Sequence, residues 1–194
     1  SSQLIKMWRN IMNKFKITAL FAISIFATTC SNDQMLRTRA NELAQKFIIT
    51  DGHIDTPWKL SKNYEDISVR TKTGDFDYVR AKEGGLDVPF MAIYIPSSYL
   101  ETGGAKEKAD SLIDMVEQIA NKDPDKFEIA YSLSDANRIF KEGKVALPMG
   151  MENGAGIEDD IKNLKHFYDR GIRYITLTHS KDNLICDSSY DEEE

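Results

Sequence analysis

The stretch Ile48-Ile49-Thr50-Asp51-Gly52-His53-Ile54-Asp55 predicts an apolar β-strand that stops at a glycine and presents a histidine and a carboxylate two residues apart. In extended backbone the side chains of residues i and i+2 point to the same side, roughly 7 Å apart. Since a zinc ion holds its ligand atoms at about 2.0–2.2 Å, one ion can bind both His53 and Asp55. A solvated turn can carry the same triplet by chance, so the rest of the chain must decide between the two interpretations.

Further apolar segments predict strands that alternate with helices. Together with the first segment, the main strands lie near residues 48, 90, 147 and 175, over the ranges 47–50, 86–95, 145–150 and 172–178. This alternation is typical of parallel βα units. His53, Asp55, Glu152 and His179 all fall just past the carboxyl ends of three of these strands. In an α/β barrel the catalytic groups converge at that edge.

The clearest predicted helix has one apolar stripe, formed by Ala109, Leu112, Ile113, Val116, Ile119 and Ala120. Ser134 is expected to be the N-cap of a brief helix that runs to residue 142, with Gly143 at its end. Amphipathic helices are also expected over residues 35–47 and before Gly171, the latter with an apolar face of Ile157, Ile161, Leu164 and Tyr168. A short strand is expected at 127–131 and a long polar loop at 61–82, and loops of this length are usually functional or mobile.

The composition is that of a soluble globular domain. Of the 194 residues, 41% are hydrophobic and 29% are charged, so a packed core is expected. The formal net charge is -6, and the sequence has no basic cluster with interleaved aromatic residues. These features argue against a nucleic-acid partner.

Residues 12–30 have the pattern of a bacterial lipoprotein signal peptide. A short basic region at residues 12–16 precedes an apolar stretch of about eleven residues, and Ala27-Thr28-Thr29-Cys30 follows. This stretch is well below the roughly 20 residues that a membrane-spanning helix needs. We expect Cys30 to be lipidated and the protein to be exported to the bacterial cell envelope and anchored there, with residues 1–11 as an upstream extension. A plain secreted protein and a retained N-terminal anchor are the alternatives, because a lipobox usually has leucine where Ala27 stands.

Two other reactive side chains are expected to be structural. Removal of the leader would leave Cys186 as the single cysteine, so no internal disulfide can form, and packing near a strand end is favoured over a reactive thiol. His166 lies in the middle of a predicted helix, off its apolar stripe, and is expected on a solvated surface.

Glu152 and His179 extend the candidate site beyond the first strand. Glu152 stands in Met149-Gly150-Met151-Glu152-Asn153-Gly154, a strand end followed by a tight turn. A carboxylate has two oxygens and can bridge two metals at the roughly 3.5–4 Å separation of two-metal hydrolases. His179 could bind metal, or it could polarise a carbonyl and stabilise an oxyanion. The alternatives are a surface glutamate that caps the turn and a histidine satisfied by backbone carbonyls.

These motifs together resemble the membrane (renal) dipeptidase family of metallopeptidases. The similarity runs from about residue 36 to the end of the sequence, and it rests on Asp51-Gly52-His53-Ile54-Asp55-Thr56-Pro57, Asp77-x-x-Arg80 with Glu83-Gly84-Gly85, Met151-Glu152-Asn153-Gly154, and Phe167-Tyr168 through Gly171-Ile172-Arg173-Tyr174-Ile175-Thr176-Leu177-Thr178-His179, followed by Asn183 and Asp187-Ser188-Ser189. The resemblance implies a (β/α)8 barrel with two Zn2+ ions that hydrolyses dipeptides. His53 and Asp55 would bind one zinc, Glu152 would bridge both, and His179 would contact the substrate and the tetrahedral intermediate.

The sequence departs from the family pattern in two respects. The family has a Gly-x-Gly-Ala-Gln-Phe type of strand where this chain has residues 84–90, which affects barrel packing but no ligand. The family also takes two further histidines for the second zinc, an arginine for the substrate carboxylate and a late aspartate from later strands, which are not present here. A barrel typically needs ~250 residues, and about 164 follow residue 30. Residues 31–194 are therefore expected to be the N-terminal half of a (β/α)8 TIM-type barrel that neither binds two zincs tightly nor turns over substrate by itself.

The function expected of the full-length protein is zinc-dependent hydrolysis of dipeptides. A hydroxide formed on the metal would attack the peptide carbonyl, His179 would stabilise the oxyanion, and the loop at 61–82 would shape part of the pocket. One alternative is a related hydrolase of cyclic amides or phosphoesters, although such enzymes usually open with His-x-His where this chain has Asp55 in the second position. The other is a lipoprotein that keeps the barrel as a non-enzymatic scaffold. The sequence gives no indication of the oligomeric state.

Overall fold

The computed structural model describes residues 3, 6–9, 12 and 32–191. The predicted lipidation site Cys30 and nearly all of the predicted leader at 12–30 lie outside these residues. The chain divides into two units, Ser1–Lys46 and Phe47–Glu194. In the first unit residues 32–46 form a helix, as the sequence predicts. Within the described part of the chain, no helix is both long and apolar enough to cross a membrane.

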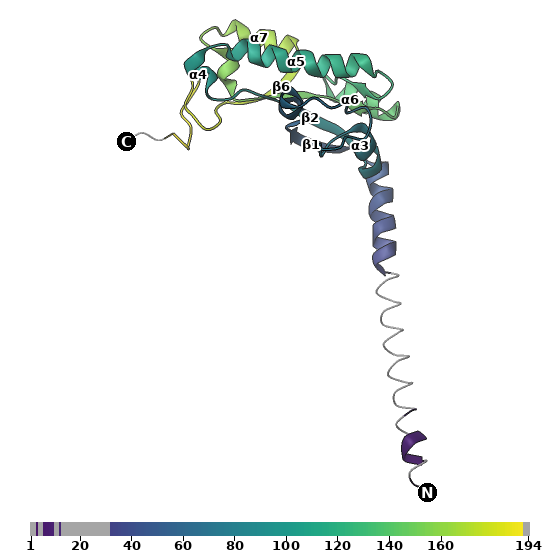
Figure 1. The fold of residues 1–194 in the computed structure, drawn as a ribbon. Helices are drawn as coiled ribbons and strands as arrows, with labels where there is room; N and C mark the ends of the chain where they lie inside the picture. Colours follow the sequence, from purple (N-terminus) through teal and green to yellow (C-terminus); the bar gives the residue numbers. More distant parts are fainter. Residues whose placement is uncertain (1–2, 4–5, 10–11, 13–31, 192–194) are drawn as a thin grey trace. The chain divides into compact units, whose positions relative to one another are not determined.

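The second unit is built around a four-stranded parallel sheet (Figure 1). Its strands are β1 (Ile49–Ile54), β2 (Leu86–Tyr94), β5 (Met149–Glu152) and β6 (Ile172–Thr176), in the order β1-β2-β5-β6. At the carboxyl ends Ile54 pairs with Met91, and Glu152 pairs with both Tyr94 and Thr176. The predicted parallel βα arrangement is therefore confirmed. A separate two-stranded parallel sheet consists of β3 (Phe127–Glu128) and β4 (Val145–Ala146).

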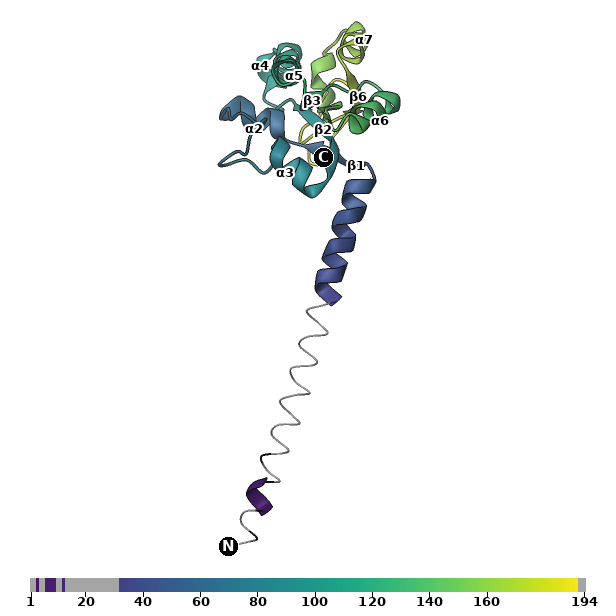
Figure 2. The ribbon, with the colours of Figure 1, turned by 90° about the vertical axis from the view of Figure 1, so that its right-hand side faces the viewer.

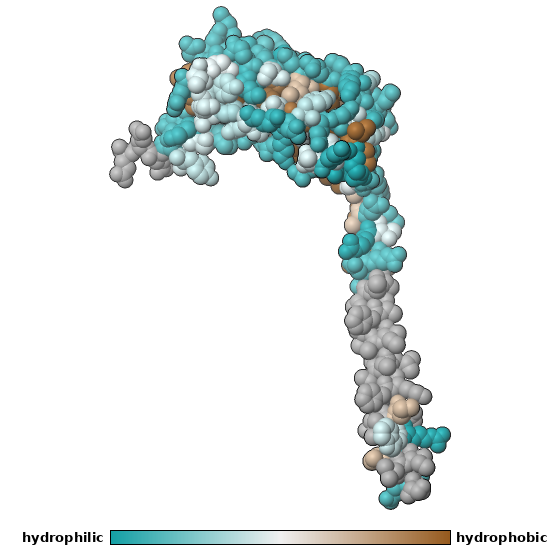
Figure 3. Space-filling view, viewed as in Figure 1, coloured by the Kyte–Doolittle hydropathy of each residue, from teal (hydrophilic) through white to brown (hydrophobic). Residues whose placement is uncertain are grey.

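Helices connect and cover the strands, and Figure 2 shows them from a second direction. They are α2 (Thr56–Lys62), α3 (Tyr78–Gly84), α4 (Tyr99–Thr102), α5 (Ala105–Lys122), α6 (Leu133–Lys141) and α7 (Lys162–Asp169), with a 3-10 helix η1 (Gly154–Ile157). In Figure 1, α5 and α7 lie over the same face of the sheet. The strands present Met91, Ile93, Met149, Met151 and Ile172 to the core on that face. All six predicted stripe residues of α5 are buried, so that helix is confirmed. Where the surface is visible in Figure 3, it is mainly hydrophilic.

The opposite face of the sheet carries the aromatic and polar side chains that surround the candidate site. Phe90 and Tyr174 have ring centroids 5.4 Å apart on this face. The ring of Tyr174 covers Gly150, where a Cβ atom would come within 2.5 Å of it. Side chains alternate along β2 and β5, whereas β6 has a register shift between its pairings with Met149 and Met151, so Ile172 and Tyr174 lie on different faces. The same β-strands therefore supply both the packed core and this second surface.

All of the predicted strands have different bounds in the structure. The strand expected at 127–131 is β3 at 127–128, and those expected at 86–95 and 172–178 end one and two residues earlier. β1 continues through Gly52 to Ile54, so His53 lies within the strand rather than after it. The segment predicted as one strand at 145–150 is divided into β4 and β5, which belong to different sheets. Pro148 lies between them and has no N–H to donate to a ladder, but its carbonyl accepts a hydrogen bond from Met91 N at 2.8 Å.

The predicted helix starts and the polar loop also need correction. The N-cap of α6 is Ser132 rather than Ser134, and the Ser132 hydroxyl accepts a hydrogen bond from Asp135 N at 3.2 Å. The loop expected at 61–82 is limited to residues 63–77, since α2 and α3 take up its two ends. Asp77 ends this loop as the N-cap of α3 and accepts a hydrogen bond from Arg80 N at 2.8 Å.

The apolar face expected for the last helix is correct only in part. Ile157 is buried, but it lies in η1, before α7. Ile161, Leu164 and Tyr168 are exposed, and Phe167 is the fully buried residue of α7. His166 is not simply solvated either, because its Nε2 lies 2.7 Å from Asp110 Oδ1 of α5 and its ring contacts Phe167. These differences follow from the packing of α7 beside α5, which buries Phe167 and brings the neighbouring histidine to a carboxylate.

Candidate metal centre

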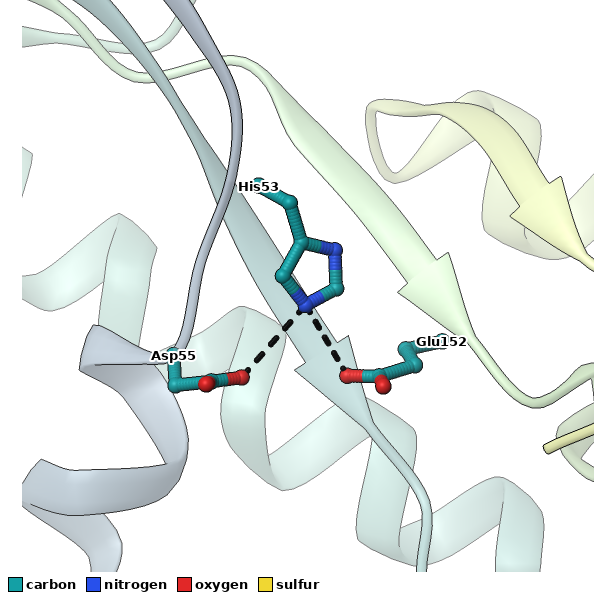
Figure 4. Close-up of side chains that lie close together, drawn as sticks. All are labelled: His53, Asp55 and Glu152. Atoms are coloured by element: carbon teal, nitrogen blue, oxygen red, sulfur yellow. Dashed lines mark ion pairs between the residues drawn. The ribbon is translucent and has the colours of Figure 1, made fainter. Parts of the chain in front are cut away.

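His53, Asp55 and Glu152 meet at the carboxyl edge of the sheet (Figure 4). His53 comes from β1, Asp55 directly follows that strand, and Glu152 is the last residue of β5. The Nε2 atom of His53 lies 3.4 Å from Asp55 Oδ1 and 3.1 Å from Glu152 Oε2. One ligand atom from each residue lies within 4.8 Å of the other two. The structure thus brings together three residues that the sequence analysis placed at one metal.

The spacing of these atoms fits a divalent metal. Ligand atoms at about 2.0–2.2 Å from a tetrahedral zinc are roughly 3.3–3.6 Å from one another. The two distances from His53 Nε2, 3.1 and 3.4 Å, are close to this range. Imidazole nitrogen and carboxylate oxygen are also suitable donors for zinc. The side chains of His53 and Asp55 are 39% and 54% exposed, so an ion can reach them from solvent.

The Glu152 carboxylate has a different neighbour at each oxygen. Oε2 faces His53, whereas Oε1 lies 3.4 Å from His179 Nε2. The Glu152 side chain is only 16% exposed, so its position is well fixed by the surrounding residues. His179 therefore lies at the predicted edge, on the other side of Glu152 from His53.

The loop that carries His179 is held to the end of β5 by hydrogen bonds. Asn183 Nδ2 donates to Leu177 O at 2.7 Å and to Asn153 Oδ1 at 3.0 Å. Asn153 is fully buried and has a φ of 75°, a left-handed conformation that asparagine tolerates better than most residues. The Ser188 hydroxyl donates to His179 O at 2.9 Å. These contacts fix the backbone on both sides of the imidazole.

A cavity of about 600 Å³ lies beside Asp55. Its walls include Trp58 and Lys59 of α2, together with Thr73 and Asp75 from the loop at 63–77. The loop at 63–77 lines this cavity, and Asp55 is the one residue of the candidate metal centre among its walls.

A comparison with known proteins identifies the family. The model of the membrane dipeptidase family (peptidase family M19) matches residues 37–194. The chain belongs to this family. The resemblance drawn from the sequence motifs is confirmed.

Curated relatives of this chain are named dipeptidases. Dipeptidase ataJ of Aspergillus terreus (strain NIH 2624 / FGSC A1156) is 28% identical over 179 residues, which are 84% of this chain and 43% of ataJ. Dipeptidase tcpJ of Claviceps purpurea (strain 20.1) is 30% identical over 157 residues, which are 73% of this chain and 36% of tcpJ. The chain thus spans about two-fifths of the length of these relatives.

Solved structures of a probable dipeptidase and of a metallopeptidase share the fold. The crystal structure of the probable dipeptidase PvdM from Pseudomonas aeruginosa has a TM-score of 0.71 and 24% identity, and the match covers 81% of this chain and 41% of PvdM. A metallopeptidase from Rhodobacter sphaeroides, liganded with a phosphinate mimic of the dipeptide L-Ala-D-Ala, has a TM-score of 0.61 and 22% identity, with 71% of this chain and 47% of that chain covered.

Sequence reasoning missed the aromatic side chains around the candidate metal centre. Tyr94, the last residue of β2, has its ring centroid 5.2 Å from that of His179 and 5.1 Å from that of Trp58. Burial, together with the negative charges of Glu152 and Asp55, raises the pKa of the Tyr94 hydroxyl, which therefore keeps its proton. Its position at the end of a strand whose neighbours carry the candidate ligands was a usable sequence signal.

Tyr174 of β6 was missed for a different reason, since it reaches the site across the sheet. Its hydroxyl lies 3.2 Å from His53 Nδ1 and donates a hydrogen bond to Gly52 O at 2.9 Å. Burial, followed by the charge of Glu152, raises the pKa of this hydroxyl as well. No local pattern relates Tyr174 to His53, because 121 positions separate them in the sequence.

Proposed function

We propose that the full-length protein containing this chain hydrolyses dipeptides with two Zn2+ ions. In this proposal His53 and Asp55 bind the first zinc and Glu152 bridges both. The observation that carries the proposal is the placement of His53 Nε2 at 3.1 and 3.4 Å from two carboxylates at the carboxyl edge of the sheet. The two differently placed oxygens of Glu152 support its role as the bridge. Membership of the membrane dipeptidase family supports the choice of a dipeptide as substrate.

The chain's own residues would position the substrate and stabilise the charge that develops on it. When bound, the metal would supply Lewis acidity, which lowers the pKa of water and polarises a carbonyl group. His179 is 40% exposed at the rim, and its imidazole can donate a hydrogen bond to the carbonyl oxygen as negative charge develops there. The ring of Tyr94 packs against that imidazole and limits its rotation.

We further propose that the sheet is the first half of a (β/α)8 barrel. The parallel order β1-β2-β5-β6 supports this, and so does the contact between Tyr174 of β6 and His53 of β1. In a flat sheet four strands would put β1 about 14 Å from β6, which is farther than a tyrosine side chain reaches. A sheet that curls, as in a barrel, would bring the two strands close enough for this contact. The exposed face of α7 is where the next helix of such a barrel would pack.

The remaining groups of the site would come from sequence outside these 194 residues. The relatives are more than twice as long as the matched segment, so we propose that the second-zinc histidines, the substrate-binding arginine and the late aspartate lie in that additional part. The chain alone would then neither bind two zincs tightly nor turn over substrate. We also propose that residues 12–30 direct export and that lipidation of Cys30 anchors the protein in the bacterial cell envelope.

Dipeptide hydrolysis by the full-length protein tests the central proposal. Free amino acids released from a panel of dipeptides would be measured before treatment with a chelator, after it, and after zinc is restored. We expect activity to disappear and return. Glu152→Gln should lower activity by at least about 100-fold, because loss of a bridging ligand should cost more than loss of the outer groups that account for about 10–100-fold. Glu101→Gln, at an exposed position of α4, serves as the matched control. Hydrolysis that survives metal removal would refute the proposal.

A further inference from the structure

The contact at Nδ1, the ring nitrogen of His53 that faces Tyr174, determines which of the two ring nitrogens carries a proton. The Tyr174 hydroxyl donates its single proton to Gly52 O, a carbonyl that can only accept. Toward His53 Nδ1, at 3.2 Å, the same hydroxyl must therefore act as the acceptor. Nδ1 is then the protonated nitrogen, and Nε2 is left as the atom that faces Asp55 and Glu152.

We propose that Tyr174 is a positioning residue that holds His53 with its Nε2 lone pair directed at the metal. This inference rests on the proposed metal centre and adds a residue to it. Histidines that bind metals generally donate their other ring N–H to a fixed acceptor, which sets the tautomer and the ring orientation. That acceptor here is a tyrosine hydroxyl supplied by the strand at the opposite edge of the sheet.

The surroundings of Tyr174 hold its hydroxyl in place. The ring lies directly over Gly150 of β5, where any side chain would collide with it. Phe90 of β2 packs against the ring at a centroid distance of 5.4 Å and an interplanar angle of 43°. Contacts from two strands thus leave the hydroxyl between His53 Nδ1 and Gly52 O, and the acceptor is prepared before a metal binds.

Removal of the Tyr174 hydroxyl alone distinguishes a role in positioning His53 from a role in packing. Tyr174→Phe keeps the ring over Gly150 and against Phe90, so a residue that only fills space would show no change in metal binding. We expect the zinc affinity of the full-length protein, measured by competition with a chromogenic chelator, to fall by about 10–100-fold. Tyr64→Phe is the matched control, since Tyr64 is an exposed tyrosine on the loop at 63–77.

A spectroscopic measurement reports the hydrogen bond itself. In the zinc-loaded protein labelled with 15N at histidine, the Nδ1 proton of His53 should give a protected, exchange-slowed signal, assigned by its absence from a His53→Asn variant. This signal should be broadened or lost in Tyr174→Phe and retained in Tyr64→Phe. Unchanged zinc affinity together with an unchanged signal in Tyr174→Phe would overturn the inference. That outcome would leave dipeptide hydrolysis by the wild type intact, so it differs from failure of the proposed function.

Discussion

Gly150→Ala should damage the candidate metal centre without altering any of its ligands. A Cβ atom at this position would lie 2.5 Å from Cε2 of Tyr174 and closer still to two other ring atoms. Carbon atoms pack best at about 3.5–4.0 Å, so the ring or the strand must move by at least about 1 Å. A shift of this size is enough to break the 3.2 Å contact between the Tyr174 hydroxyl and His53 Nδ1.

Two measurements on the full-length protein would show the effect of this substitution. Denaturant unfolding should give a loss of about 1–3 kcal/mol in the free energy of unfolding, the usual cost of overpacking. Competition with a chelator should show that zinc binds at least about tenfold more weakly. Gly84→Ala is the matched control, because a Cβ at Gly84 meets nothing within 4 Å and α3 already places this residue in a helix.

A double-variant comparison would locate the collision. If the Tyr174 ring is the obstacle, Gly150→Ala should cost little stability in a Tyr174→Ala background, with a coupling energy of about 0.5–3 kcal/mol. Wild-type stability and wild-type zinc affinity in the Gly150→Ala protein would refute the reasoning. A stability loss that stays the same in the Tyr174→Ala background would show that something other than the ring is displaced.

Other predictions concern stability. Asp77→Asn should lower the free energy of unfolding by roughly 2–4 kcal/mol, because the fully buried Asp77 carboxylate accepts hydrogen bonds from Thr71 and Arg80. Burial alone would raise the pKa of Asp77, but these hydrogen bonds outweigh it and hold the pKa below its usual value. The contribution of the Asp77 carboxylate to stability is thus present above about pH 4 and is lost as the pH falls through the lower folded-state pKa. Urea titrations should therefore show the difference in unfolding free energy between variant and wild type narrowing below that pH. Phe167→Ala should cost about 3–5 kcal/mol in the same titrations, since the ring is completely buried between α7 and the sheet. Zinc at 100 times its dissociation constant should stabilise the full-length protein by about 2.7 kcal/mol in thermal or denaturant unfolding, and a chelator should abolish the increase.

The sequence was sufficient for those parts of the fold that depend on local patterns. The stripe of α5 was predicted correctly because a continuous apolar face at helical spacing has to be buried. The buried face of α7 was not predicted correctly, because the side of a short helix that is buried depends on the elements that pack against it. Phe167 rather than Leu164 faces the core because α7 lies beside α5, an arrangement that no local pattern specifies.

Competing local signals explain the remaining errors. Ser132 and Ser134 could both cap a helix, and the choice of Ser132 follows from Asp135, whose carboxylate accepts hydrogen bonds from Tyr131 N and the Ser132 hydroxyl. Pro148 interrupts an apolar run that reads as one strand. In both cases the deciding residue, Asp135 or Pro148, lies within the predicted segment, but its effect depends on hydrogen bonds with residues outside that segment.

The candidate site could be predicted as far as topology determines it. Parallel strands align their carboxyl ends, so a histidine, an aspartate and a glutamate at the ends of β1 and β5 had to share one edge. The contribution of Tyr174 depends instead on curvature, because it joins the two outer strands of the sheet.

Curvature and cation binding are linked through the His53 ring. With Nδ1 protonated, Nε2 presents a lone pair to the carboxylates of Asp55 and Glu152, so three acceptors face one another. Such a group is unfavourable unless a cation lies among the three, and a divalent metal can fill that role. The metal binds better when the ring cannot turn away. The hydrogen bond from His53 to Tyr174, possible only because the sheet curls, supplies that restraint.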